Sequence, residues 1–66
     1  MNINKLKGKI VENGMNVEKL AEEIGTSTAT LYRVMQTPEK ITVGMASEIK
    51  NALKLSNEDA IEIFLT

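Results

Sequence analysis

Two short apolar stripes separated by one glycine occupy residues 17–36, which read VEKLAEEIGTSTATLYRVMQ. Gly25 tolerates the positive φ that commonly ends a helix, and Ser27 can cap a new helix directly after it. A steep crossing of two helices over so few residues also needs a small side chain, which Ala21 provides. We therefore predict two short helices joined by a sharp turn. Their apolar positions are Val17, Leu20, Ala21 and Ile24 in the first helix and Leu31, Val34 and Met35 in the second.

Helical spacing of apolar residues also precedes this stretch and predicts a first helix over residues 3–13. Gly14 supplies a C-terminal stop for that helix, and Asn16 can cap the next one. The lysines of this segment fall on other faces than the apolar stripe. The stripe consists of Ile3, Leu6, Ile10 and Val11.

Two further helices are predicted beyond residue 36. Pro38 ends the preceding helix and opens a loop over residues 37–40, because its ring disfavours α conformation in the residue before it. Thr42 can cap a fourth helix, and Ser56 a fifth, with Asp59 completing a sequence that resembles a capping box. The expected inward positions are Val43, Ala46, Ile49, Ala52 and Leu53 in the fourth helix and Ala60, Ile61, Phe64 and Leu65 in the fifth.

The composition fits one small all-α domain spanning residues 1–66. Hydrophobic residues make up 42% of the chain and aromatic residues only 3%, so the core must be aliphatic. No apolar run approaches the roughly 18 residues that span a bilayer, and the first five residues lead into no continuous apolar segment. These features predict a cytoplasmic, unprocessed protein.

The absence of both cysteine and histidine excludes whole classes of function. Without these side chains there is no disulfide, no zinc finger and no Ser-His or Cys-His catalysis. The sequence also contains no glycine-rich phosphate loop and no nucleophile beside a base, so we expect neither an enzyme nor a cofactor, a metal site or a small-molecule ligand.

The net charge of −1 and the isoelectric point of about 5.3 argue mildly against nucleic acid as a partner. The acids, however, are segregated along the chain. Residues 24–38 contain no acid, and their one charge is Arg33. The positive potential of this segment would increase if the first helix and the loop over residues 37–40 face it, because they carry Lys5, Lys9 and Lys40.

The whole pattern resembles the phage repressor and Cro-like helix-turn-helix regulators, the XRE family. The residues that carry the resemblance are Leu20, Ala21, Gly25, Ser27, Leu31 and Arg33, all at the family's spacing. One leading and two trailing helices extend it over almost the whole chain, and the sequence resembles small regulators encoded by phages and mobile elements of Gram-positive bacteria. The resemblance implies a compact five-helix, lambda-repressor-like DNA-binding bundle whose second and third helices form the helix-turn-helix.

The resemblance also implies roles for individual residues on double-stranded operator DNA. The helix at about 28–36 would enter the major groove, where arginine pairs with guanine and small side chains contact a thymine methyl. The base-reading positions would be Thr28, Ala29, Arg33 and Gln36. The phosphate contacts would come from Ser27, Thr30, Tyr32 and Lys40. The motif core would be Leu20, Ala21, Gly25, Leu31 and Val34.

Three positions depart from the family's pattern and keep a second hypothesis open. Val17 stands where the family often has a phosphate-binding glutamine, Thr28 is shorter than the usual Gln or Arg, and Thr26 replaces an aliphatic residue. The alternative function is a helix-turn-helix module that binds another protein, as an antirepressor or adaptor, through the same face or the apolar C-terminal helix.

The C-terminal helix carries more large apolar groups than one helical face can turn inward. We expect Ile61 with Phe64 or Leu65 to pack inside, which leaves Ile63 or a neighbour exposed. Two interpretations stay open for such a patch. In the first, the patch associates, either with a second copy in a homodimer or with another protein. In the second, the end of the chain simply packs against the bundle.

Overall fold

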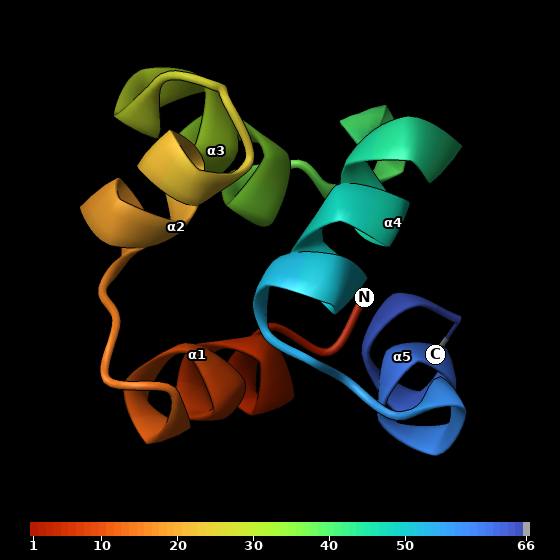
Figure 1. Cartoon of the computed structure of the whole chain (residues 1–66). Coiled ribbons are helices and arrows are strands. Elements are labelled where there is room, and N and C mark those ends of the chain that lie inside the picture. Colours follow the sequence, from red (N-terminus) through yellow and green to blue (C-terminus); the bar gives the residue numbers. More distant parts are fainter. Residues whose placement is uncertain (66) are drawn as a thin grey trace.

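The computed structural model describes residues 1–65, which form α-helices and one short 3-10 turn, without a strand (Figure 1). The all-α fold class expected from the sequence is thereby confirmed. Within this part of the chain no helix is both long and apolar enough to cross a membrane. The elements are α1 Ile3–Glu12, α2 Val17–Glu23, α3 Thr28–Gln36, the 3-10 turn η1 Pro38–Lys40, α4 Val43–Ala52 and α5 Asn57–Phe64.

Each α-helix begins at a polar side chain whose oxygen accepts a hydrogen bond from the backbone N–H three residues later. Such caps satisfy one of the N–H groups that the first turn leaves without an acceptor. The four predicted caps are confirmed, and a fifth is found at Asn2. The distances are 3.1 Å for Asn2, 2.8 Å for Asn16, 3.1 Å for Ser27, 3.0 Å for Thr42 and 3.0 Å for Ser56.

The core is wholly aliphatic, with side chains from all five helices. No polar or charged residue among residues 1–65 is buried, so no side chain of the core needs a hydrogen-bond partner. Leu6, Leu20, Leu31 and Ile63 are completely inaccessible. The other buried positions are Ile10, Ala21, Ile24, Val34, Met35, Ile49, Leu53 and Leu55.

Two apolar residues that the helical spacing assigns to the core lie outside it. Val11 is 73% exposed because it stands about 100° around α1 from Ile10, which takes the inward position. Val43 is 89% exposed because it is the first residue of α4, and Ile41 and Met45 on either side of it pack against the core instead. The segment predicted as a loop after α3 contains η1.

The predicted orientation of α5 is also wrong. Ile63 is fully buried, whereas Ile61 is 55% and Leu65 77% exposed. The reason is that α5 turns the face carrying Asp59 toward α1, and Ile63, four residues later, shares that face. The Ile63 carbonyl also accepts a hydrogen bond of 2.7 Å from the Asn2 N–H, which joins the two ends of the fold.

A cluster of opposite charges reinforces the contact between α1 and α5. The Asp59 carboxylate lies 3.3 Å from the Lys5 ammonium and 3.1 Å from that of Lys9, and Glu62 also pairs with Lys5. The hydrogen bond from Lys9 holds the pKa of Asp59 below its usual value of 3.8. Hydrogen bonds to Glu62 and Asp59 raise the pKa values of Lys5 and Lys9, respectively.

The turn between α2 and α3 closes with two backbone hydrogen bonds. The Thr26 N–H donates to the Ala21 carbonyl at 2.9 Å and the Gly25 N–H to the Glu22 carbonyl at 3.2 Å. This six-residue pattern requires a left-handed residue at its centre, and Gly25 has φ +74°. The same pattern ends α1 at Gly14, with φ +70°, and α4 at Lys54, with φ 53°.

Replacing Gly25 by alanine is expected to destabilise the fold by about 1 kcal/mol, because a Cβ is unfavourable at positive φ. No neighbouring atom would obstruct the new methyl group, so the loss isolates backbone strain. Gly8→Ala is the matched control: this glycine lies inside α1 with equally open space, and the same change should raise stability by about 0.5–1 kcal/mol. Urea unfolding measures both, and equal effects of the two changes would contradict this account.

The stability of the protein should fall with acid through Asp59. A lowered folded-state pKa means that this stabilisation is fully present above about pH 4 and is lost as the pH falls through the lowered value. Asp59→Asn should therefore flatten the acid side of the profile of melting temperature against pH. Glu48→Gln, at an exposed acid of α4 outside the cluster, should leave it unchanged. If the melting temperature of Asp59→Asn fell with acid as steeply as that of the unmodified protein, the role of the cluster would be refuted.

Candidate functional site

The outward face of α3 carries the base-reading positions that the sequence singles out. Leu31, Val34 and Met35 anchor the opposite face in the core. Ala29, Arg33 and Gln36 are exposed, whereas Thr28 is half-buried. Because Ala29, Arg33 and Gln36 follow one another at intervals of four and three residues, they share one side of the helix, and Thr28 directly precedes Ala29 in its first turn. The structure thus brings the four predicted base-reading residues onto one short helix whose position is determined by its buried side.

The start of α3 is organised by two hydroxyl groups. Ser27 Oγ accepts from the Thr30 N–H at 3.1 Å and donates its own proton to Thr30 Oγ1 at 2.8 Å. Thr30 therefore keeps its hydroxyl proton for an outside acceptor, whereas the Ser27 proton is already used. The N–H groups of Thr28 and Ala29, in the first turn, have no acceptor within the helix and face the same end. This end can donate hydrogen bonds to an anionic oxygen.

The charges around α3 differ from one of the sequence expectations. Lys5 and Lys9 do not add to the potential of this face, because both ammonium groups pair with acids of α5. Lys19 of α2 pairs with Glu22 at 3.5 Å and Glu23 at 3.7 Å. The cationic groups left near α3 are Arg33, the exposed Lys40 of η1, and Lys7.

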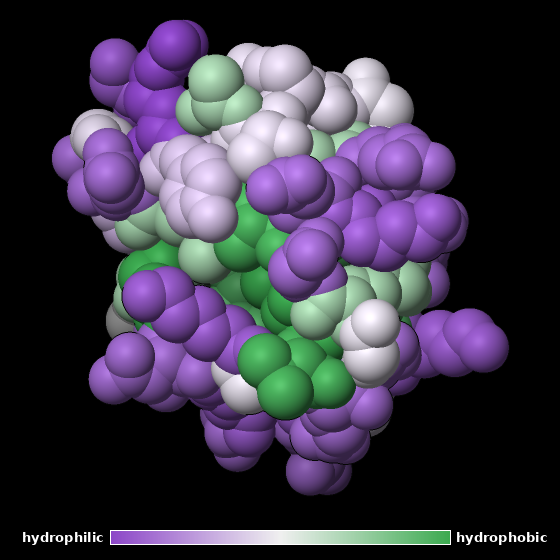
Figure 2. Space-filling view, turned by 90° about the vertical axis from the view of Figure 1, so that its left-hand side faces the viewer, coloured by the Kyte–Doolittle hydropathy of each residue, from purple (hydrophilic) through white to green (hydrophobic). Residues whose placement is uncertain are grey.

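Tyr32 lies at the edge of an apolar hollow between α1, α2 and α3. The hollow has a volume of about 360 Å³, and the tyrosine is 48% exposed. On the face viewed in Figure 2, apolar surface is set back between hydrophilic side chains. We call it the α1–α3 hollow. Its lining residues are Lys7, Ile10, Val11, Met15, Asn16, Val17 and Tyr32.

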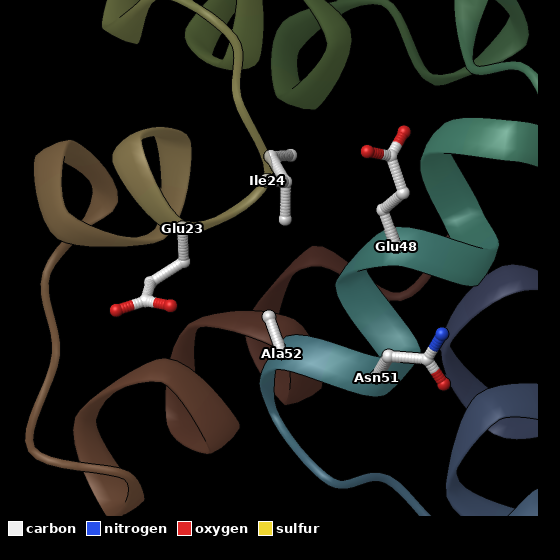
Figure 3. A pocket seen from close by; sticks show the side chains of 5 residues that line it. All are labelled: Glu23, Ile24, Glu48, Asn51 and Ala52. Atoms are coloured by element: carbon white, nitrogen blue, oxygen red, sulfur yellow. The ribbon is translucent and has the colours of Figure 1, made fainter.

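A second recess, of about 320 Å³, lies between the end of α2 and α4 (Figure 3). Glu23 and Glu48 reach it from opposite sides, but their carboxylates point apart, and Ile24 and Ala52 lie between them. The described residues contain no group of three or more acidic, His or Cys side chains arranged to hold a metal ion.

Sequence reasoning missed two residues of the surface around α3. Lys7 and Val11 belong to the α1–α3 hollow although they precede the motif in sequence. Their spacing of four residues places them on one face of α1, which is the available signal. That this face meets Tyr32 depends on how α1 packs against the α2–α3 pair, and no local pattern encodes that.

Comparison with known proteins adds one similarity. No protein-family model and no solved structure matches the chain. The aspartate carbamoyltransferase regulatory chain of Buchnera aphidicola subsp. Acyrthosiphon pisum is 33% identical over 63 residues, which is 96% of this chain. The chain spans 39% of that relative's length, and the similarity carries no inference about activity.

Proposed function

We propose that this protein is a sequence-specific DNA-binding transcriptional regulator of the Cro or repressor type, with a lambda-repressor-like fold. In this proposal α2 and α3 are the helix-turn-helix, and α3 lies in the major groove of an operator. The observation that carries the proposal is the outward face of α3, which exposes Ala29, Arg33 and Gln36 within the acid-free segment 24–38. A phosphate-lined groove favours a protein face without carboxylates.

In this proposal, base recognition falls to the side chains on the outward face of α3. The Arg33 guanidinium can donate two hydrogen bonds to the O6 and N7 atoms of a guanine. Ala29 can contact only a thymine methyl, and the hydroxyl of Thr28 can reach a base edge or pack against such a methyl. Gln36, in the last turn, can bind an adenine if the helix axis lies along the groove. Of these four residues, Arg33 therefore contributes most to distinguishing one base pair from another.

Phosphate contacts hold the protein in register without reading sequence. The Thr30 hydroxyl and the free N–H groups of the first turn of α3 supply donors at one end of the helix. Lys40 supplies charge from η1, beyond the other end. Tyr32 offers its hydroxyl from the rim of the α1–α3 hollow, and Ser27 contributes by keeping the cap in place.

A second candidate function is favoured by the α1–α3 hollow. Its exposed apolar groups, Val11 and Tyr32, together with the half-buried Val17, offer a surface that DNA phosphates cannot use. A protein partner with an apolar side chain can use it, so a protein-binding adaptor is the alternative. The exposed apolar side of α5 offers this alternative a second contact.

Arg33→Ala is expected to relax base preference at one operator position and to reduce discrimination by about 1–3 kcal/mol. Sequences enriched from a random DNA pool by the purified protein provide the ligand, and competition binding measures the change. Lys54→Ala is the control, because it removes the same charge from the connection between α4 and α5, opposite α3 in Figure 1. Unchanged binding by the double variant Arg33→Ala and Thr28→Ala would show that α3 does not read the operator.

The dependence of binding affinity on salt concentration distinguishes the two candidate functions. Binding to duplex DNA releases counterions, so the logarithm of the affinity should fall linearly with the logarithm of salt concentration, with a slope of about −0.9 for each phosphate contact. Lys40→Ala should make that slope shallower by about one unit. The affinity of an apolar contact with a protein partner would barely change with salt concentration. Failure to enrich any DNA sequence at low salt would favour the adaptor.

A further inference from the structure

Three polar residues line the α1–α3 hollow, all of them are exposed, and together they offer mainly hydrogen-bond donors. The Lys7 ammonium carries three donors and has no ion-pair partner among residues 1–65. Asn16 Oδ1 accepts from the Lys19 N–H at 2.8 Å as the cap of α2, so the two Nδ2 hydrogens are left for an outside acceptor. The Tyr32 hydroxyl can donate as well. These groups favour an occupant that brings acceptors.

The floor of the α1–α3 hollow is apolar and is held in place by the core. Ile10 is buried, and the half-buried Met15 and Val17 pack against the core. Val11 is the exposed aliphatic side chain of the lining. The volume of about 360 Å³ lies near the low end of the roughly 300–1,000 Å³ range of binding pockets. An aliphatic side chain of a partner can therefore enter the hollow and cover Val11.

The charges around the hollow select the sign of its occupant. Within the described chain no carboxylate lines it, and Lys7 is its one charged lining side chain. The acids that directly follow lining residues in sequence are Glu12 and Glu18. Glu12 pairs with Lys9 at 3.5 Å, and Glu18 belongs to the first turn of α2. A basic segment would be repelled by Lys7, whereas an acidic segment would be attracted.

We propose that the α1–α3 hollow binds an acidic, aliphatic segment of a partner protein, and that this binding excludes operator DNA. An aliphatic side chain of the segment fills the hollow beside Val11, and a neighbouring carboxylate pairs with Lys7. The docking of the segment follows from the hollow alone. The exclusion of DNA rests on the proposed function.

The size of the hollow indicates the form of the partner. Seven residues line it, whereas an interface between two globular surfaces uses about 20–30 residues on each side. A short linear segment therefore fits the hollow better than the surface of a folded domain does. The segment needs only one large aliphatic residue with an aspartate or glutamate close to it in sequence.

The exclusion of DNA follows from the position of Tyr32. This residue lines the hollow, and in the proposed function its hydroxyl contacts a DNA phosphate. One hydroxyl cannot serve the segment and the phosphate together. A carboxylate paired with Lys7 would also bring negative charge to the hollow beside α3, where it repels phosphates at distances up to the Debye length of about 8–10 Å. The segment would thus regulate the regulator.

The docking is tested first without DNA, with short random peptides displayed on phage and selected on the purified full chain. Enriched peptides are expected to combine a large aliphatic residue with a nearby aspartate or glutamate. Synthetic copies of an enriched peptide give the affinity by fluorescence anisotropy. A second copy, in which each acid is replaced by its amide, should bind more weakly.

Two variants each remove one feature of the hollow. Lys7→Glu should weaken binding of the acidic peptide about tenfold, because attraction becomes repulsion. Val11→Gln should also weaken it about tenfold, because an aliphatic contact is lost. The matched controls Lys54→Glu and Val43→Gln make the same changes at exposed positions outside the hollow, and both should keep the affinity. Circular dichroism verifies that all four variants fold.

Competition measures the exclusion of DNA. The acidic peptide should displace DNA that the protein has enriched from a random pool. Val11→Gln should keep its affinity for that DNA and need about ten times more peptide for the same displacement. Peptide and DNA bound together would overturn the exclusion. If the protein bound no DNA, the proposed function would fail, and the peptide affinities would still decide the docking.

The docking itself is overturned if no peptide is enriched, or if Lys7→Glu binds the enriched peptides as tightly as the unmodified protein does. A loss of DNA affinity in Val11→Gln would show that DNA covers the hollow instead. Association of the protein with itself that Val11→Gln abolishes would show that a second copy covers it. Either result would also overturn the inference.

Discussion

The rest of the structure depends on the left-handed backbone at Gly25. Its φ of +74° lets the Thr26 N–H reach back to the Ala21 carbonyl, which ends α2 and turns the chain within four residues into α3. Ala21 is 1% exposed, so two helices meet there without a large side chain between them. Once that crossing exists, Leu20 and Leu31 are completely buried and the remaining helices pack around them. The exposed face of α3 is a consequence of this single backbone conformation.

Electrostatics then separates the molecule into two sides. Acids and lysines neutralise each other between α1 and α5, where Asp59 and Glu62 meet Lys5 and Lys9. This pairing means that the positive charges of Lys5 and Lys9 do not contribute near α3. It also neutralises Asp59 and Glu62 on α5. Arg33 is left as the one charge within the acid-free segment 24–38. A chain with a net charge of −1 can therefore present a face suited to phosphates.

A bundle this small has too little interior for all of its aliphatic side chains, and the surplus is concentrated in two places. One is the α1–α3 hollow beside the proposed recognition helix, and the other is the surface between α4 and α5 that exposes Val43, Ile61 and Leu65. Aliphatic groups that one copy cannot bury are available for association, because covering apolar surface is favourable whichever molecule supplies the cover. Both surfaces are mainly apolar, and each is lined by one lysine, Lys7 in the hollow and Lys50 between α4 and α5.

The sequence by itself determined the local structure: the helices, four of their five caps, the glycine turn and the buried positions Leu20, Leu31 and Val34. Each depends on contacts within a few residues, which hydrophobic spacing and capping chemistry encode directly. Only the tertiary structure decided which side of each outer helix faces inward, and it placed Val11, Val43 and Ile61 outside and Ile63 inside. The spacing of apolar residues shows that a helix has an apolar side. It does not determine, to within one residue, which positions of that side face the core. For α5 the rotation of the helix was settled by ion pairs and a backbone hydrogen bond to residues fifty or more positions away in the sequence.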